Sequence, residues 1–482
     1  MNIYQFYYFL IILKEICSSS NKIYKIPFGL FKQKNSESDS SIINNIINNG
    51  KYVNLSLGTP SQITKFELDT NSQTFCASNE LFNRNDSITY EQISRDISYF
   101  DYEVAEYGYT SKDLLNIDNN ANRTDFILAT KFQDYKLNNL GVIGLLIPKR
   151  IQYGVYPFFV SLKGAKLVNS SIWTLKFFEN ISLIDQINFN EKNDIIIGEF
   201  IFGDEPSKYE NDSKKYNASE YYKITPLKGK DTIYWEFEFT NIYLKLKNKK
   251  NDSKIYFLGR KDAKILINFS LIVGPTYFFD FIKTNYFSQY ISEKICLEKR
   301  VESDYSYIEC DSTLKIENFP TISFQQVGFQ YTFNFTYKDL FIEDKTNNKY
   351  IFLILKKDYF LDWILGTVFL RKFQFVFNIE SKTIGYYRQF FKDDEENNDE
   401  DDNKDNNSDT TRIIIIVSLA VIFAILLIIL GMVIQKFCCK DRKKRANELK
   451  DNYEYESENA EENILAINED KTKIKENDYK KF

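Results

Sequence analysis

The chain has 482 residues, a formal net charge of −5 and 43% hydrophobic residues, so it can hold more than one domain. This charge balance favours neither a nucleic-acid-binding protein nor a basic membrane-surface protein. The sequence contains no histidine, which excludes Ser-His-Asp catalysis, Cys-His catalysis and zinc sites with a histidine ligand.

The first 20 residues have the pattern of a secretory signal peptide. An apolar and aromatic run extends over residues 4–13, and Ser18, Ser19 and Ser20 are small residues suited to cleavage. No Lys or Arg precedes the apolar run, so a buried N-terminal strand is the alternative. We expect residues 21–49 to form an N-terminal extension or a pro-segment.

Residues 51–72 predict two strands with alternating apolar residues, joined by a turn at Gly58, Thr59 and Pro60. The second strand runs into Asp69, which is followed by Thr70, Asn71 and Ser72. A carboxylate at the end of a strand, on a tight turn, is well placed for chemistry. Short aromatic and β-branched runs continue to about residue 391, so the body is expected to be mainly β.

The body resembles the pepsin-like aspartic proteases in eight blocks that follow the order of that family. The blocks are residues 57–72, 141–148, 159–175, 195–198, 222–227, 234–237, 319–324 and 363–386. The resemblance covers roughly residues 50–390 and implies a bilobal, mainly β fold. The implied N-terminal β lobe spans residues 50–205 and the implied C-terminal β lobe spans residues 206–391. Members of this family take one catalytic aspartate from an equivalent turn in each lobe.

The second of these turns departs from the family pattern. The family reads Ala-Ile-Val-Asp-Thr-Gly-Thr-Ser-Leu-Leu-Thr-Gly-Pro, and residues 263–275 match it without a gap at Ala263, Ser270, Leu271, Gly274 and Pro275. In this register Leu266 stands where the second aspartate belongs, and Ile267 replaces the threonine whose hydroxyl braces the opposite turn.

Asparagine replaces the glycine of both motifs, at Asn71 and Asn268. Asparagine tolerates positive φ better than other non-glycine residues, so both turns can survive while the site becomes more crowded. We also expect Leu266 and Ile267 to desolvate Asp69 and raise its pKa.

We predict a catalytic role for Asp69 and, by resemblance, a binding cleft around both turns. The cleft residues are Thr70, Asn71, Ser72, Tyr102, Ile267, Asn268 and Ser270, with Tyr102 as the flap tyrosine. Asp262 is not favoured as the second aspartate, because that alignment needs a deletion before Gly274. A dimer in which each chain donates its Asp69 is not favoured either, because the second lobe already occupies the place of the partner. No cofactor and no metal are expected.

The cysteines and glycosylation sequons give information on the cellular compartment. An oxidising compartment would pair Cys296 with Cys310, while Cys76, where the family usually has a core tryptophan, is expected to be a buried free thiol. Asn211, Asn217 and Asn251 lie in polar loops and are the best glycosylation candidates.

Residues 392–411 form an acidic segment without apolar residues, which predicts a solvated linker. The uncharged apolar run over residues 413–434 predicts a transmembrane helix, with bounds at residues 412–435. Basic residues after it put the tail, residues 436–482, in the cytoplasm. Cys438 and Cys439 are either palmitoylation sites or ordinary reduced thiols. The expected protein is a single-pass type I membrane protein of the secretory or endolysosomal system or the cell surface.

Three functions remain open at this point. The first is a pseudoprotease that binds a peptide or protein ligand in its cleft, as a monomer and without nucleic acid. The second is an active aspartic endopeptidase with an unorthodox site. The third is a structural or adhesive surface glycoprotein, because a fold alone does not determine function.

Overall fold

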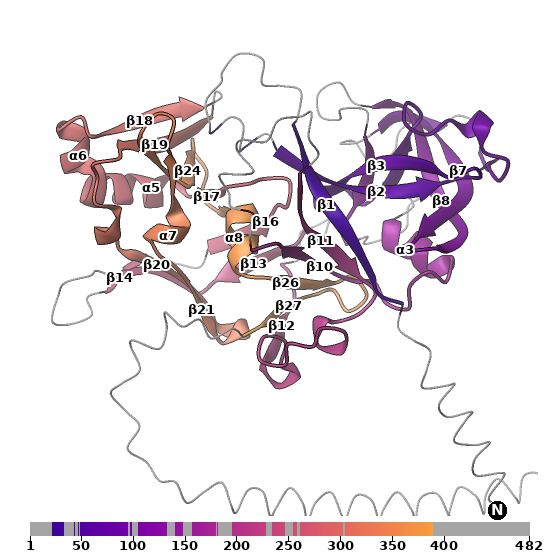
Figure 1. The fold of residues 1–482 in the computed structure, drawn as a ribbon. Helices are drawn as coiled ribbons and strands as arrows, with labels where there is room; N and C mark the ends of the chain where they lie inside the picture. The colour runs from indigo at the N-terminus through magenta and orange to yellow at the C-terminus, as the bar shows by residue number, and fades with distance from the viewer. Residues whose placement is uncertain are drawn as a thin grey trace, which may run out of the picture. The chain divides into compact units, whose positions relative to one another are not determined.

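The computed structural model describes residues 22–32, 43, 47, 49–94, 97–98, 105–132, 140–147, 157–179, 181, 195–227, 234–245, 254–257, 261–301 and 304–388. The chain divides into two units, residues 1–389 and 390–482, and every described residue belongs to the first unit (Figure 1). The expected signal peptide, acidic linker, transmembrane helix, cytoplasmic tail and both lipidation candidates lie outside the described residues. Among the residues that are described, no helix is long and apolar enough to cross a membrane.

Strands dominate the described residues, as the sequence predicts. The largest sheet has 14 strands and extends from the N-terminal half into the last strands of the unit. In sheet order its strands are β12 (Tyr221–Ile224), β27 (Thr383–Tyr387), β26 (Phe375–Asn378), β10 (Ile172–Phe177), β11 (Ile196–Phe202), β1 (Tyr24–Lys32), β2 (Asn49–Leu57), β3 (Gln62–Asp69), β9 (Gly141–Gly144), β4 (Phe75–Ser78), β8 (Asn120–Phe132), β7 (Ala105–Ile117) and β5 (Glu91–Gln92), with β6 (Ile97–Ser98) beside β7.

The C-terminal half of the unit is built on two further sheets. The first contains β13 (Glu236–Phe239), β16 (Lys261–Ile265), β25 (Trp363–Leu365), β17 (Ile272–Gly274), β24 (Ile354–Lys357), β19 (Tyr305–Asp311), β23 (Lys349–Phe352) and β22 (Phe341–Asp344), with β18 (Cys296–Val301) beside β19. The second contains β15 (Lys254–Phe257), β14 (Asn241–Lys245), β20 (Thr321–Gln326) and β21 (Tyr331–Phe335).

Short helices cover these sheets. The α-helices are α3 (Phe158–Gly164), α5 (Thr276–Ile282), α6 (Ser288–Ser292), α7 (Tyr337–Leu340) and α8 (Thr367–Lys372), and η4 (Lys283–Phe287) is a π-helix between α5 and α6. Single 3₁₀ turns form η1 (Arg84–Asp86), η2 (Pro206–Lys208), η3 (Ala218–Glu220), η5 (Ile316–Asn318) and η6 (Val327–Phe329).

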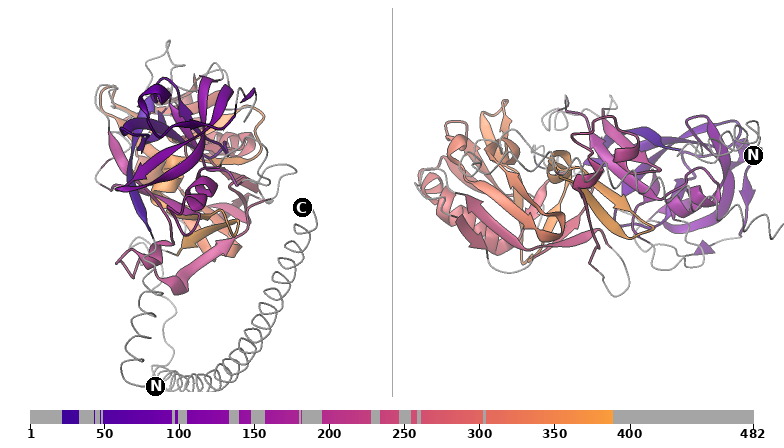
Figure 2. Two further views of the ribbon diagram at one scale, coloured as in Figure 1. Left: turned by 90° about the vertical axis from the view of Figure 1, so that its right-hand side faces the viewer. Right: turned by 90° about the horizontal axis from the view of Figure 1, so that it is seen from below.

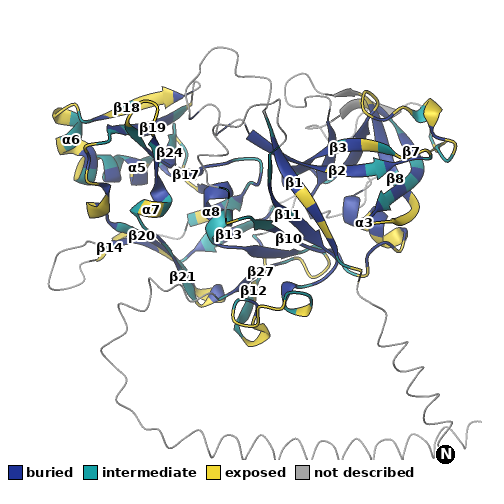
Figure 3. Ribbon diagram, viewed as in Figure 1, coloured by how far each residue is buried: buried dark blue, intermediate teal, exposed yellow. Residues whose placement is uncertain are grey.

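We call residues 22–205 the first lobe and residues 206–388 the second lobe. The late strands β26 and β27 join β10 in the large sheet, so strands from both ends of the unit meet between the lobes (Figure 2). Trp173 stacks on Phe377 with ring centroids 4.0 Å apart, and Trp235 packs edge-on against Phe377 at 5.0 Å. These three rings are buried, and they form part of the core that joins the lobes. Figure 3 shows that most of β10 and β26, which carry Trp173 and Phe377, is buried.

The start of the body differs from the expectation. Residues 21–49 were expected to be an extension or pro-segment, but residues 24–32 form β1, which pairs with β11 on one side and β2 on the other. Apolar side chains of β1, such as Phe28 and Leu30, are buried. Sequence reasoning assigned no strand to this segment. The fold therefore begins before residue 50.

The hairpin predicted over residues 51–69 is confirmed. Strands β2 and β3 are antiparallel, and the register pairs Leu57 with Gln62 next to the turn and Tyr52 with Glu67 at the far end. The predicted inter-lobe strands at residues 195–198 and 222–227 overlap β11 and β12, which both belong to the large sheet.

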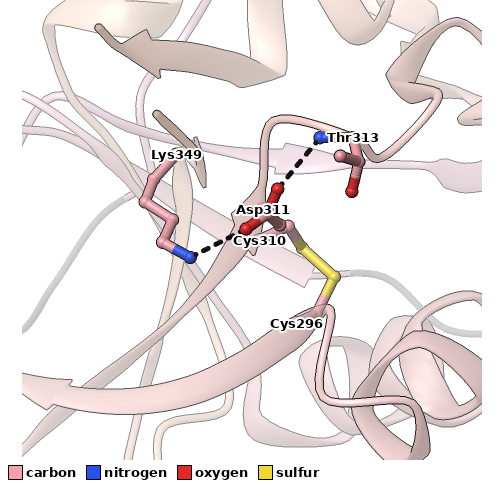
Figure 4. The surroundings of a disulfide bond; sticks show 5 residues. All are labelled: Cys296, Cys310, Asp311, Thr313 and Lys349. Carbon is pink, nitrogen blue, oxygen red and sulfur yellow. Dashed lines mark hydrogen bonds and ion pairs between the residues drawn. A yellow bond between two sulfur atoms is a disulfide. The ribbon is translucent and has the colours of Figure 1, made fainter. Parts of the chain in front are cut away.

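The predicted disulfide between Cys296 and Cys310 is also confirmed. The two cysteines lie directly opposite each other on β18 and β19, and both are buried. Next to this bridge, the Thr313 amide and the Lys349 ammonium group bind the Asp311 carboxylate and lower its pKa (Figure 4). Cys76 is a buried free cysteine, and burial raises the pKa of its thiol to about 12.

We predict that the double substitution Cys296→Ala with Cys310→Ala lowers the free energy of unfolding by about 3 kcal/mol, because the bridge closes a loop of moderate length in the unfolded chain. Denaturant unfolding of the purified protein measures this change. The wild-type protein kept under strong reductant should match the variant. An unchanged unfolding midpoint in oxidising buffer would contradict the prediction.

Candidate functional site

Asp69 ends β3 on a turn that holds its side chain in place. The Asn71 amide donates to Asp69 Oδ1 at 2.8 Å, and the Leu145 amide donates to the Asp69 carbonyl at 2.7 Å. Thr70 and Ser72 are buried, and the Ser72 hydroxyl accepts from the Thr74 amide at 3.1 Å. The turn is therefore fixed on both sides of the carboxylate.

Strand register identifies the equivalent position in the second lobe. Parallel pairing of β3 with β9 puts Asp69 opposite Gly144. The same pairing of β16 with β25 puts Ile265 opposite Leu365, so the next residue, Leu266, reaches the level of Gly366. By this register, Leu266 occupies in the second turn the place that Asp69 occupies in the first.

Backbone hydrogen bonds show the same correspondence between the two turns. The Gly144 amide donates to the Thr74 carbonyl at 2.9 Å, and the Gly366 amide donates to the Leu271 carbonyl at 3.0 Å. Leu271 follows Leu266 at the same spacing as Thr74 follows Asp69. A Cβ at either glycine would overlap the backbone of the adjacent segment, so both positions need glycine for this close approach.

A hydrogen bond to the Thr70 side chain joins the two turns. The Ile267 amide donates to Thr70 Oγ1 at 3.3 Å, and this bond is buried. Ile267 has no hydroxyl group, so it cannot return an equivalent side-chain bond to the first turn. The brace between the turns is therefore made from the first lobe only.

A buried polar network crosses the lobe boundary beside this brace. Asn268 Nδ2 donates to Glu67 Oε1 at 2.6 Å, and Lys51 Nζ donates to Ser270 Oγ at 3.4 Å. Lys51 is 0% exposed, Glu67 4% and Ser270 2%. We call Lys51, Glu67, Asn268 and Ser270 the boundary network. It joins β2 and β3 of the first lobe to the second turn.

Burial and charge act in opposite directions on Lys51. Desolvation lowers the pKa of its ammonium group and the Glu67 charge raises it. Desolvation is the larger effect, so the pKa falls from 10.5 to about 7. Lys51 therefore loses its proton much closer to neutral pH in the folded protein than in the unfolded chain.

Trp235 provides another contact between the lobes. Its indole Nε1 donates to the Leu145 carbonyl at 2.7 Å, and its own carbonyl accepts from the Ile265 amide at 2.9 Å. Leu145 also binds the Asp69 carbonyl, so the chain leading into the second turn is tied to the segment that supports the first.

The remaining predicted residues fall in several places. Tyr102 and Asn251 lie outside the described residues. Asp262 is exposed on β16, opposite Glu238 and before the second turn. Asn211 and Asn217 are exposed in the loops around η2 and η3. Within the part of the chain that the structure describes, no cluster of three or more Cys, Asp or Glu residues could hold a metal ion.

Sequence reasoning missed Lys51 and Glu67. Lys51 alternates in phase with the buried Val53, Leu55 and Leu57 of β2. A charged residue at an apolar phase of a strand is the signal that could have identified it.

We predict that the boundary network makes stability depend on pH through Lys51. Between its folded pKa of about 7 and its unfolded value of 10.5, the unfolded chain binds more protons, so the free energy of unfolding rises as pH rises through this window. Denaturant unfolding from pH 6 to 10 measures this slope. Lys51→Met should flatten it, whereas the exposed control Lys315→Met should keep it. An equal slope in wild type and Lys51→Met would contradict this account.

We also predict that Thr70→Val destabilises the protein by about 1–3 kcal/mol, because it leaves the buried Ile267 amide without an acceptor. Thr70→Ser keeps the hydroxyl group and is the matched control. Denaturant unfolding should rank the variants with Thr70→Val lowest. A Val variant as stable as the Ser variant would show that the brace contributes nothing.

Comparisons with known proteins agree with this geometry. The family model described as "Eukaryotic aspartyl protease" matches residues 51–388. A protein of Echis ocellatus named renin is 23% identical over 377 residues, which cover 73% of this chain and 83% of the relative. Another renin of the same organism is 24% identical over 207 residues, covering 39% of this chain and 50% of the relative. The family model spans most of both lobes and both turns, and the chain therefore belongs to the pepsin-like eukaryotic aspartyl protease family.

Proposed function

We propose that this protein is a pseudoprotease, which keeps the pepsin-like scaffold, binds a peptide or protein segment between its lobes and does not hydrolyse it. The observation that carries the proposal is the position of Leu266, at the place in the second turn that corresponds to Asp69.

Aspartic proteolysis requires two carboxyl groups that share one proton. Like charges about 3 Å apart cannot both ionise, so one group acts as an acid while the other acts as a base on water. Leu266 brings no carboxyl group to the second turn. Asp69 can accept a proton from water, but the leaving amine then lacks its acid, and each general acid or base is worth about 10²- to 10⁴-fold in rate.

The buried interior of the lobe boundary supports a binding role. The Thr70 brace, the boundary network and the Trp235 indole all hold the two lobes together through buried hydrogen bonds. A boundary that is fixed in advance reduces the entropy lost on binding an extended ligand. Such rigidity serves a peptide-binding cleft even when the catalytic pair is incomplete.

The proposed location is the lumenal or extracellular side of a membrane, with the protein anchored by one helix over residues 412–435. The apolar run and the basic residues after it motivate this topology. The Cys296–Cys310 disulfide supports it, because disulfides persist in oxidising compartments.

We predict that the purified protein does not cleave a peptide library between about pH 3 and 7, the range in which shared carboxyl protons titrate. Wild type and Asp69→Ala should give the same product profile by mass spectrometry. Leu266→Asp alone should recover little activity, because Ile267 and Asn268 still lack the hydroxyl brace and the glycine of the family motif.

A pepsin-like protease of known activity serves as the positive control for the library. Circular dichroism should show that each variant is folded. Cleavage by wild type that is lost in Asp69→Ala would overturn the pseudoprotease proposal and favour an active endopeptidase with an unorthodox site.

A further inference from the structure

Phe269 lies on the second turn between two members of the boundary network but does not belong to it. Asn268 and Ser270 both bind first-lobe residues, whereas Phe269 between them meets Tyr305 of β19. The two ring centroids are 6.0 Å apart with an interplanar angle of 32°. Both rings are half-buried, so an aromatic surface begins at the turn that faces Thr70.

Lys357 extends this surface on the neighbouring strand. It lies opposite Tyr305 in the antiparallel pair of β19 and β24. Its ammonium nitrogen is 5.4 Å from the Tyr305 ring centroid and 6.0 Å from that of Phe360. The Phe360 amide donates to the Lys357 carbonyl at 3.2 Å, and the Phe360 carbonyl accepts from the Thr276 amide at 3.0 Å, which fixes this turn.

The ammonium group of Lys357 has different neighbours from the charged groups of the basic residues near it. Lys356 pairs with Asp280 at 3.0 Å, and Arg300 pairs with Asp358 at 3.3 Å. Lys357 has no carboxylate partner among the residues that the structure describes, and its ammonium group lies over two rings instead. It is also half-exposed, so an incoming carboxylate can reach it.

Two exposed apolar side chains follow Lys357 in the chain. Tyr359 is 96% exposed and Leu361 is 61% exposed, on the turn that also carries Phe360. Exposed apolar side chains of this size can be covered by a partner.

We propose that Phe269, Tyr305, Lys357 and Phe360 form a subsite that selects an acidic side chain in the bound peptide. This inference rests on the proposed peptide-binding function and names its ligand class: an extended segment with an Asp or Glu next to apolar residues. The ligand carboxylate accepts a charge-assisted hydrogen bond from Lys357 Nζ. The rings hold the lysine in position by cation–π contact and pack against the apolar neighbours of the acidic residue.

The test begins with a randomised library of C-terminally amidated peptides, presented to the solubilised full-length protein. Amidation ensures that any acid preference comes from side chains, and a second library with free C-termini shows whether a terminal carboxylate binds instead. Wild type should enrich peptides with one Asp or Glu beside apolar residues.

A selected peptide and its Glu→Gln analogue are then titrated against wild type, Lys357→Gln and Lys357→Glu. We expect the Glu peptide to bind wild type about tenfold more tightly than the Gln peptide, as for one charged hydrogen bond. Lys357→Gln should abolish this difference and Lys357→Glu should reverse it. Lys345→Glu, which makes the same charge change at an exposed turn between β22 and β23, is the matched control and should preserve the preference.

The outcomes separate the two proposals. Retention of peptides without an acid preference, or a preference that survives Lys357→Gln, would overturn the subsite and leave the peptide-binding function intact. Enrichment of free C-termini alone would assign the cation to a terminal carboxylate and also overturn it. If no peptide binds to folded wild type, the proposed function fails and the subsite fails with it.

Discussion

The lobe boundary depends on the burial of two ionisable side chains, Lys51 and Glu67. Removing two charges from water costs several kcal/mol per ion unless they are paired and hydrogen-bonded. Here both are almost fully buried, and each also contacts a second-lobe side chain, Ser270 or Asn268. Separation of the lobes would break these contacts and rehydrate the charges, so the network couples the position of the second turn to the interior of the first lobe. In this way a polar interior fixes one arrangement of the two turns.

Under the proposed function, this constraint explains how the fold persists without a complete catalytic pair. In a working dyad, the two aspartates and their hydroxyl braces hold the turns against each other. Here Leu266 and Ile267 supply neither a carboxyl nor a hydroxyl group, and the Thr70 hydroxyl, Asn268 and the Trp235 indole make the contacts across the boundary. Asn268 takes the position of a motif glycine and uses its amide to bind Glu67. The same substitution therefore adds a hydrogen bond across the boundary. On the same turn Phe269 packs near the half-buried Tyr305, and the Lys357 ammonium group lies over the Tyr305 ring.

Sequence reasoning predicted features that depend on local pattern or on an ordered set of motifs. The hairpin ending at Asp69, the mainly β body and the Cys296–Cys310 bridge belong to this class. It missed β1, which lies in the segment expected to be an extension or a pro-segment. It also missed Lys51 and Glu67, because alternation predicts which face a residue occupies but not the partner that it meets there. The surface of Phe269, Tyr305 and Lys357 could not be predicted for the same reason, because three separate segments of the chain form it.

The most direct test of this account is the titration of Asp69 itself, followed by isotope-edited NMR of the aspartate carboxyl groups and assigned with Asp69→Asn. Two carboxyl groups that share a proton titrate in two coupled steps that belong to the pair. If Leu266 removes the second acid, the Asp69 signal should change in one step, and no other carboxyl signal should change its midpoint strongly when Asp69 is replaced by Asn. Two coupled steps that collapse to one in the Asn variant would show that Asp69 has an acid partner and would contradict the account.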